Sequence, residues 1–138
     1  MNTDPISLEH ALASFDDLWS PRIVTRVNDY DVRIAKLKGD FTWHSHADTD
    51  EFFLVLDGVL NIALRDTSGE RTVRLPTGSL FTVPKGVEHK PFTAEGASIL
   101  LFEPTGTLNV GDRHDEIPDY VETTIGRDLA PSPTDAYR

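Results

Sequence analysis

The feature that most constrains the fold is a series of short apolar runs, each ended by a turn signal, that begins at Arg22. The runs are rich in Val, Ile, Leu, Phe and Thr, which favour strands, and turn signals such as Asp57-Gly58 recur about every ten residues. The predicted strands are Arg22–Val27, Tyr30–Leu37, Phe41–His46, Glu51–Leu56, Val59–Arg65, Arg71–Leu75, Leu80–Val83, His89–Thr93 and Ser98–Glu103. No helical pattern separates them. The sequence therefore predicts an all-β sandwich or barrel of antiparallel strands.

The segments on either side of this region have different patterns. A short N-terminal helix is predicted, with Ser7 as its N-cap and Pro21 as its stop. Its apolar positions at helical spacing are Leu8, Ala11, Leu12, Phe15, Leu18 and Trp19. This apolar side would dock on the barrel or contact a second copy of the chain. After the barrel, Tyr120–Ile125 is a candidate edge strand, and the last dozen residues are expected to be a mobile tail. We therefore expect a helical segment at 1–21, a barrel at 22–104, and a C-terminal extension and tail at 105–138.

The composition excludes several classes of function. The 138-residue chain has 13 Lys and Arg against 23 Asp and Glu, a net charge of −10, which argues against nucleic acid or an anionic membrane as a partner. The chain has no cysteine, so disulfides, iron–sulfur clusters and thiol nucleophiles are ruled out. No apolar run approaches the ~20 residues of a membrane span. The first residues lack the basic region of a signal peptide, so a cytoplasmic location is expected.

Four side chains form the most informative pattern in the sequence. His44 and His46 are two residues apart on a predicted strand, so both imidazoles project from one face. Glu51 starts the next predicted strand, where a hairpin would return its carboxylate toward the two histidines. His89 follows the turn at Pro84-Lys85-Gly86 and starts a later strand. If all four side chains face one interior, they make a site of three imidazoles and one carboxylate.

This set of donors suits one divalent metal ion. Imidazole binds Fe, Mn, Ni, Zn and Cu, and one carboxylate adds hard character. A tetrahedral zinc ion would use all four ligands, whereas an octahedral ion would leave two positions open for substrate, water or O₂. The ligand types do not select among these metals. The alternative is a group of unrelated histidines, but neutral imidazoles buried side by side without partners would be costly.

Two stretches of the chain resemble the motifs of a known family. GDFTWHSHADTDEFFLVLDG, from Gly39 to Gly58, resembles the first motif of the cupins, and GSLFTVPKGVEH, from Gly78 to His89, resembles their second. Two features depart from the family pattern. Four residues rather than five separate the first Gly from the first His, and Thr93 stands where the family often has Asn.

The resemblance implies a double-stranded β-helix, or jelly-roll barrel, with a metal at its centre. It assigns the ligands as His44, His46, Glu51 and His89, and it also implies frequent homodimers. The stretch from Leu101 to Asp112 is similar to the end of small single-domain cupins described as mannose-6-phosphate-isomerase-like. That likeness is one of fold and does not assign a reaction.

Strand alternation predicts which residues line the pocket beside the metal: Thr42, Phe53, Val55 and Thr93. An apolar lining with few polar groups suits a small organic ligand. No catalytic residue can be assigned, although Glu103, at the end of a predicted strand, is a candidate acid–base group. The sequence has no phosphate loop and no dinucleotide fingerprint, so no organic cofactor is expected.

Two functions from different classes remain open. The first is a metalloenzyme acting on a small oxygen-bearing molecule such as a sugar or hydroxy acid, by isomerase or lyase chemistry or as an iron-dependent dioxygenase. The absence of an assured base favours oxygenation slightly, because isomerisation needs a proton-transfer group. The second is a non-catalytic ligand-binding or sensor module. The expected partners are a small molecule and a second copy of the chain.

Overall fold

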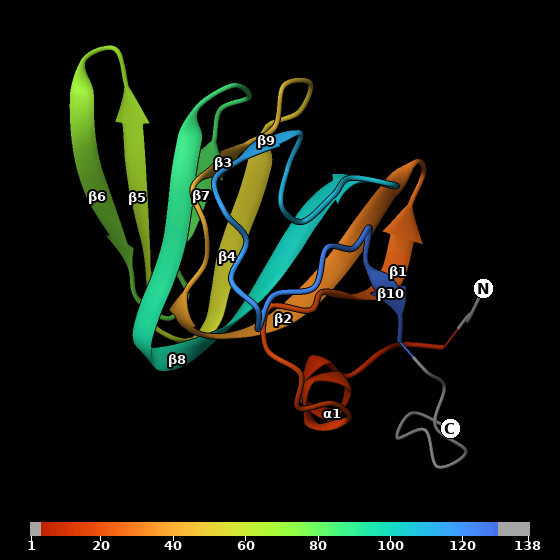
Figure 1. The fold of residues 1–138 in the computed structure, drawn as a ribbon. Helices are drawn as coiled ribbons and strands as arrows, with labels where there is room; N and C mark the ends of the chain where they lie inside the picture. The colour runs from red at the N-terminus through yellow and green to blue at the C-terminus, as the bar shows by residue number, and fades with distance from the viewer. Residues whose placement is uncertain (1–3, 130–138) are drawn as a thin grey trace.

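The computed structural model describes residues 4–129, which form one strongly bent sheet of ten strands and a single short helix (Figure 1). The elements are α1 (Leu8–Ala13), β1 (Arg22–Val27), β2 (Tyr30–Asp40), β3 (His44–Ser45), β4 (Glu51–Gly58), β5 (Leu60–Asp66), β6 (Gly69–Leu75), β7 (Leu80–Val83), β8 (Glu88–Pro104), β9 (Arg113–His114) and β10 (Arg127–Asp128). The prediction of an all-β fold with a short N-terminal helix is confirmed.

The long strand β8 joins the two halves of the jelly roll. Its first part pairs with β5, with Leu64 opposite His89, and its last part lies between β2 and β4. The strand bends between these parts (Figure 1), near Gly96, whose φ of +102° is the kind of conformation that glycine adopts without strain. The two predicted strands, His89–Thr93 and Ser98–Glu103, are therefore one bent strand in the structure, and its pairing with β2 shifts register at the bend.

Strand β2 also differs from its prediction. It continues through Gly39 to Asp40, where a turn was expected, and the pairing with β8 shifts register between Leu37 and Gly39. The following predicted strand, Phe41–His46, shrinks to the two residues of β3. This short strand lies between β8 and β9 and pairs with both.

The helix ends earlier than predicted. Ser7 does cap it, with its hydroxyl accepting a hydrogen bond from the backbone N–H of His10 at 3.2 Å. Beyond Ala13, however, the helical prediction is wrong. Leu18 makes a parallel bridge to Lys36, and Trp19 adopts a φ of +55°. The segment gains hydrogen bonds to β2 that a continued helix would not make.

The C-terminal region contributes two edge strands, β9 and β10. The predicted strand at Tyr120–Ile125 is wrong, because this segment is held by Asn109: the Asn109 N–H donates to the Thr124 carbonyl, and the Thr124 N–H donates to Asn109 Oδ1, both at 2.9 Å. Arg127 and Asp128 instead pair in parallel with β1. Of the expected mobile tail, residues 130–138 lie outside the described residues.

The apolar core lies between the two halves of the sheet. Alternate residues of each strand point inward, for example Phe53 and Val55 of β4 and Ile99 and Leu101 of β8. Two groups of buried polar side chains interrupt this core. One consists of His44, His46, Glu51 and His89, and the other of Asp31, Arg33 and Glu103. Among residues 4–129, no helix has the length and apolar character needed to cross a membrane.

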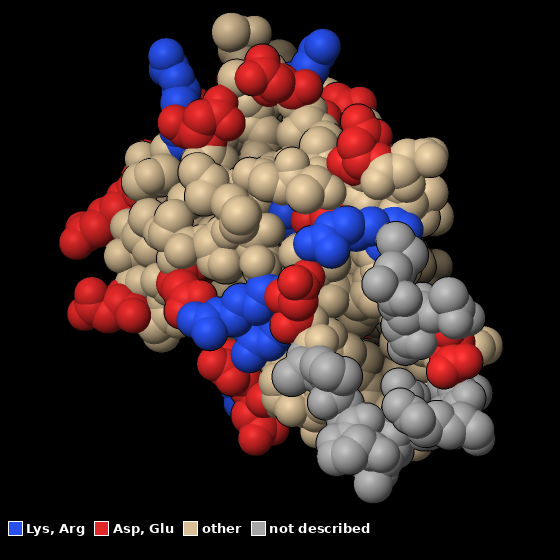
Figure 2. Space-filling view, turned by 90° about the vertical axis from the view of Figure 1, so that its right-hand side faces the viewer, with Lys and Arg blue, Asp and Glu red and all other residues tan. Residues whose placement is uncertain are grey.

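On the side of the molecule that carries β1 and β10, basic and acidic side chains lie next to one another (Figure 2). The ion pairs of these strands include Arg26 with Asp128 at 3.2 Å and Arg127 with Glu122. Such exposed pairs contribute little stability, typically about 0–1 kcal/mol each.

Candidate metal site

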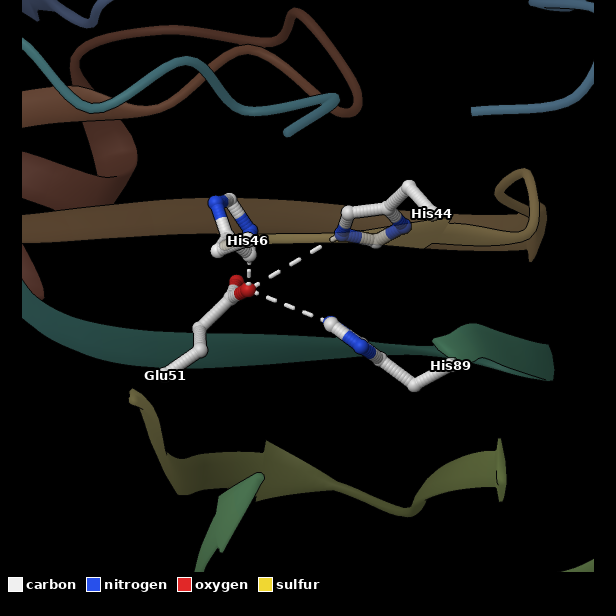
Figure 3. Close-up of side chains that lie close together, drawn as sticks. All are labelled: His44, His46, Glu51 and His89. Carbon is white, nitrogen blue, oxygen red and sulfur yellow. Dashed lines mark hydrogen bonds and ion pairs between the residues drawn. The ribbon is translucent and has the colours of Figure 1, made fainter. Parts of the chain in front are cut away.

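Four side chains from three strands and one loop converge inside the barrel (Figure 3). His44 belongs to β3 and lies opposite His89 of β8 in the ladder. His46 follows β3 directly, and Glu51 is the first residue of β4. The structure thus brings together all four predicted ligands, although the strand carrying the histidine pair is shorter than expected.

The donor atoms surround one carboxylate oxygen. Glu51 Oε2 lies 2.6 Å from His46 Nε2, 3.2 Å from His89 Nε2 and 3.8 Å from His44 Nε2. One ligand atom from each residue lies within 4.8 Å of all the others. Each of the four residues is at most 6% exposed. The cluster is therefore a compact, water-poor set of three nitrogens and one carboxylate.

Backbone carbonyls fix the protonation of two rings. His44 Nδ1 lies 2.9 Å from the Thr42 carbonyl, and His89 Nδ1 lies 3.0 Å from the Val87 carbonyl. Because a carbonyl only accepts, Nδ1 of each ring carries the proton and donates it. The lone pair of Nε2 then faces the cluster, which is the arrangement found around metal-ligating histidines.

Two atoms of the cluster lack hydrogen-bond partners. His44 Nε2 and His46 Nε2 are buried and make no hydrogen bond, although His46 Nε2 is close to the Glu51 carboxylate. A buried polar atom without a partner is unfavourable by about 1–3 kcal/mol. A cation between the rings and the carboxylate would satisfy both nitrogens, so the residues present fit a divalent metal ion.

The pKa directions differ among His44, His46 and Glu51. Burial alone would raise the pKa of Glu51, but the three surrounding histidines outweigh it and lower that pKa well below its usual value. Burial lowers the pKa of His44. Burial also opposes a charge on His46, but the adjacent Glu51 carboxylate outweighs it and raises the pKa of His46. The carboxylate is therefore anionic at neutral pH.

A cavity lies beside the cluster. Its volume is about 40 Å³, enough for a few waters. Its wall is mostly apolar, and its polar members are His44, Glu51, Glu103 and Asn109. The apolar members are Trp19, Pro21, Ala35, Leu37, Phe41, Phe53, Pro91, Ile99 and Leu101.

Of the four residues expected to line the pocket, Phe53 lies in this wall, and Thr42, Val55 and Thr93 are not among its members. The Thr42 hydroxyl donates to the Glu116 carbonyl at 2.9 Å, and Thr93 Oγ1 accepts from the Gly96 N–H at 3.1 Å. Val55 packs in the apolar core. Strand alternation identified the buried face of each strand but did not show which part of the interior is empty.

A buried ion-pair network adjoins the cavity. Arg33 is fully buried, and its guanidinium contacts Asp31 Oδ2 and Glu103 Oε1, each at 2.9 Å. Burial and the nearby Glu51 carboxylate outweigh the attraction of Arg33 and raise the pKa of Glu103 to about 8. Sequence reasoning noted Glu103 but missed Arg33. The signal was that Asp31 and Arg33 share the strand face of the buried Ala35 and Leu37.

The fold and the donor set define a small jelly-roll barrel with a His₃Glu cluster that could hold one metal ion. Residues 31–102 match the family model described as the cupin domain, and the chain belongs to this family. The resemblance noted in the sequence is thereby confirmed at the level of the family.

One curated relative is the uncharacterized protein YdbB of Bacillus subtilis (strain 168). It is 39% identical over 67 residues, which cover 49% of this chain and 57% of that protein. The chain thus spans little more than half the length of this relative.

Two solved structures are also similar. A cupin-2 domain containing protein from Shewanella frigidimarina is 42% identical, with a TM-score of 0.68 over 72% of this chain and 93% of that chain. Protein NMB1881 from Neisseria meningitidis is 29% identical, with a TM-score of 0.65 over 73% and 99% of the two chains. Both likenesses agree with the jelly-roll fold.

Proposed function

We propose that this protein is a metal-dependent enzyme that acts on a small oxygen-bearing molecule such as a sugar or hydroxy acid. One divalent ion (Fe, Mn, Ni, Zn or Cu) would be held by His44, His46, Glu51 and His89. The observation that carries the proposal is the pair of buried Nε2 atoms of His44 and His46, which have no hydrogen-bond partner and face an anionic carboxylate beside a cavity.

Each residue has a role that its contacts support. The carbonyls of Thr42 and Val87 orient the rings of His44 and His89 through their Nδ1 atoms. The cluster residues are buried beside a mostly apolar wall, and this low-dielectric setting strengthens the electrostatic interactions there. When bound, a divalent ion would polarise a carbonyl or hydroxyl oxygen of the substrate.

Glu103 favours a reaction with a proton transfer. It is the one carboxyl other than Glu51 among the described residues that line the cavity. A raised pKa suits a group that exchanges a proton near neutral pH. This supports isomerase or lyase chemistry alongside oxygenation.

The second candidate function is a non-catalytic ligand-binding or sensor module. It is favoured by the wall of the cavity, which is mostly apolar, and by Arg33, which ties the Glu103 carboxyl in an ion pair. In that case the ion would only anchor a ligand.

A spectroscopic test separates these functions. The protein would be loaded with Co²⁺, and its visible spectrum recorded with sugars, hydroxy acids and diols, while mass spectrometry follows each compound. An enzyme requires a spectral change and a new product, both lost in the His46→Ala variant. A spectral change without product, with Fe²⁺ and O₂ also tried, would establish the binding module. A spectrum insensitive to all compounds would contradict both functions.

A further inference from the structure

Two segments that flank the matched family domain complete the wall of the cavity. The domain covers residues 31–102, but Trp19 and Pro21 line the cavity from the N-terminal side and Asn109 lines it from the C-terminal side. Trp19, Pro21 and Asn109 therefore shape the cavity from segments that are not part of the family domain.

Trp19 is held firmly in the cavity wall. Its backbone N–H donates to the Lys36 carbonyl and its indole Nε1–H donates to the Lys38 carbonyl, both at 2.9 Å. Its ring stacks on Phe41 with 4.9 Å between ring centroids. The φ of +55° is unfavourable for a bulky side chain, so these contacts must hold the conformation against strain.

The indole is connected to the metal cluster through one ring. Phe41 stacks on Trp19 and meets the ring of His44 edge-on, with 5.1 Å between centroids. Trp19, Phe41 and His44 all line the same cavity. A molecule bound at the cluster would therefore extend along Phe41 toward the indole.

Some polar groups in the cavity wall already have partners within the protein and are not free to bind a ligand. The Asn109 side chain is fully used, because Nδ2 donates to the Glu122 carbonyl at 2.7 Å and Oδ1 accepts from the Thr124 N–H. Glu103 Oε1 is paired with Arg33. What remains for a ligand is an oxygen-binding end at the His/Glu cluster and a short apolar wall that ends at Trp19.

We propose that Trp19 is the specificity-determining residue of the cavity. It limits the ligand to a short aliphatic carboxylate or hydroxy acid, with its oxygens at the cluster and a body of few carbon atoms against Phe41 and the indole. The proposal rests on the proposed function for the oxygen-binding end, whereas the length limit rests on the cavity itself.

The length limit can be measured with linear monocarboxylates from acetate to hexanoate. Their affinities for the Co²⁺-loaded protein would be measured by visible titration and calorimetry. The wild type should bind the short members and discriminate against pentanoate and hexanoate. Removing the indole in Trp19→Ala opens room for several methylenes, so these longer acids should bind about ten-fold tighter or better.

A matched control is Leu18→Ala, in the same segment, because Leu18 is 42% exposed and is not part of the cavity wall. It should keep the wild-type length profile. Trp19→Phe keeps an aromatic ring in the wall and should shift the limit by less than Trp19→Ala, which provides a test if the alanine variant fails to fold. An unchanged length profile in a folded Trp19 variant would overturn the proposal.

Tryptophan fluorescence gives a readout that does not depend on the metal. The chain has two tryptophans, and Trp43 lies under the guanidinium of Arg65, 4.1 Å from its ring centroid. In Trp43→Phe all tryptophan emission comes from Trp19, so short acids should change it. Length-dependent changes of the same size with and without bound metal would uphold the role of Trp19 and refute the metal as the oxygen-binding end for the ligand. Full metal occupancy with no response of Trp19 fluorescence to any acid would uphold the metal site and refute the role of Trp19.

Discussion

At the scale of single residues, two buried carboxyls near one cavity have opposite acid–base properties. Three histidines lower the pKa of Glu51, whereas burial and the charge of Glu51 raise the pKa of Glu103 to about 8. Under the proposed function, this divergence suits Glu51 to cation binding and Glu103 to proton exchange. The spacing of the chain predicted the four donors because strand alternation and a hairpin place them on one face. It did not single out Arg33, which is paired with Asp31 two residues away and with Glu103, which is distant in the sequence.

The raised pKa of Glu103 predicts a pH dependence of stability. A group that binds its proton more tightly when folded stabilises the folded state most at low pH, and this contribution is lost as pH rises from about 5 toward about 8. In chelator-treated protein, the unfolding free energy of the wild type relative to Glu103→Gln should fall over this range, by at most about 1.4 kcal/mol per pH unit. Urea unfolding at several pH values measures the difference. A difference that is flat between pH 5 and 8 would contradict the raised pKa.

At the scale of elements, the site depends on β3, a strand of only two residues. β3 is held between β8 and β9, and the loop before β9 packs tightly against it: the Asp112 N–H donates to the Ser45 carbonyl at 3.1 Å. A Cβ added at Gly111, whose φ is +70°, would overlap the Ser45 carbonyl and approach the His44 ring. The loop can pack this closely only with glycine at this position.

Replacing Gly111 with Ala should therefore displace β3 and weaken metal binding. Gly78 is a matched control, since its φ is +85° and an added Cβ would meet nothing within 4 Å. Gly78→Ala should cost only the left-handed backbone penalty of about 1–2 kcal/mol. Gly111→Ala should cost more and reduce metal affinity about 10–100-fold, as disturbed supporting contacts do. Urea unfolding and metal titration measure both effects, and equal effects in the two variants would refute this account.

The element boundaries show what local sequence patterns can and cannot predict. β1 and β7 were predicted to the residue, because turn residues end them on both sides. The segment from Phe15 to Trp19 has helical spacing, but its hydrogen bonds to Lys36 and Lys38 come from a strand about twenty residues away. Such long-range competition is invisible to periodicity. The sequence also did not distinguish a bent strand β8 from two strands, because a glycine such as Gly96 can mark either a bend or a break.

At the scale of the whole molecule, the outer surface retains apolar residues. Leu80 is 61% exposed, and Tyr30 and Phe102 stack on each other at 4.9 Å at one end of the β2–β8 pair. Sheet edges and exposed apolar surface favour association with another copy of the chain. Homodimerisation stays a prediction. Light scattering at micromolar concentration should give twice the mass of one chain, and the mass of a single chain would contradict it.

The central claim is that His44, His46, Glu51 and His89 hold one divalent ion, and the most direct test is metal content. Protein purified without added metal, and again after loading, would be measured by elemental analysis beside His46→Ala and beside His114→Ala, whose exposed histidine lies on β9 outside the cluster. We predict close to one ion per chain in the wild type and in His114→Ala, and loss of most of it in His46→Ala with strand content by circular dichroism preserved. Full metal occupancy in His46→Ala, or no metal in the loaded wild type, would contradict the account.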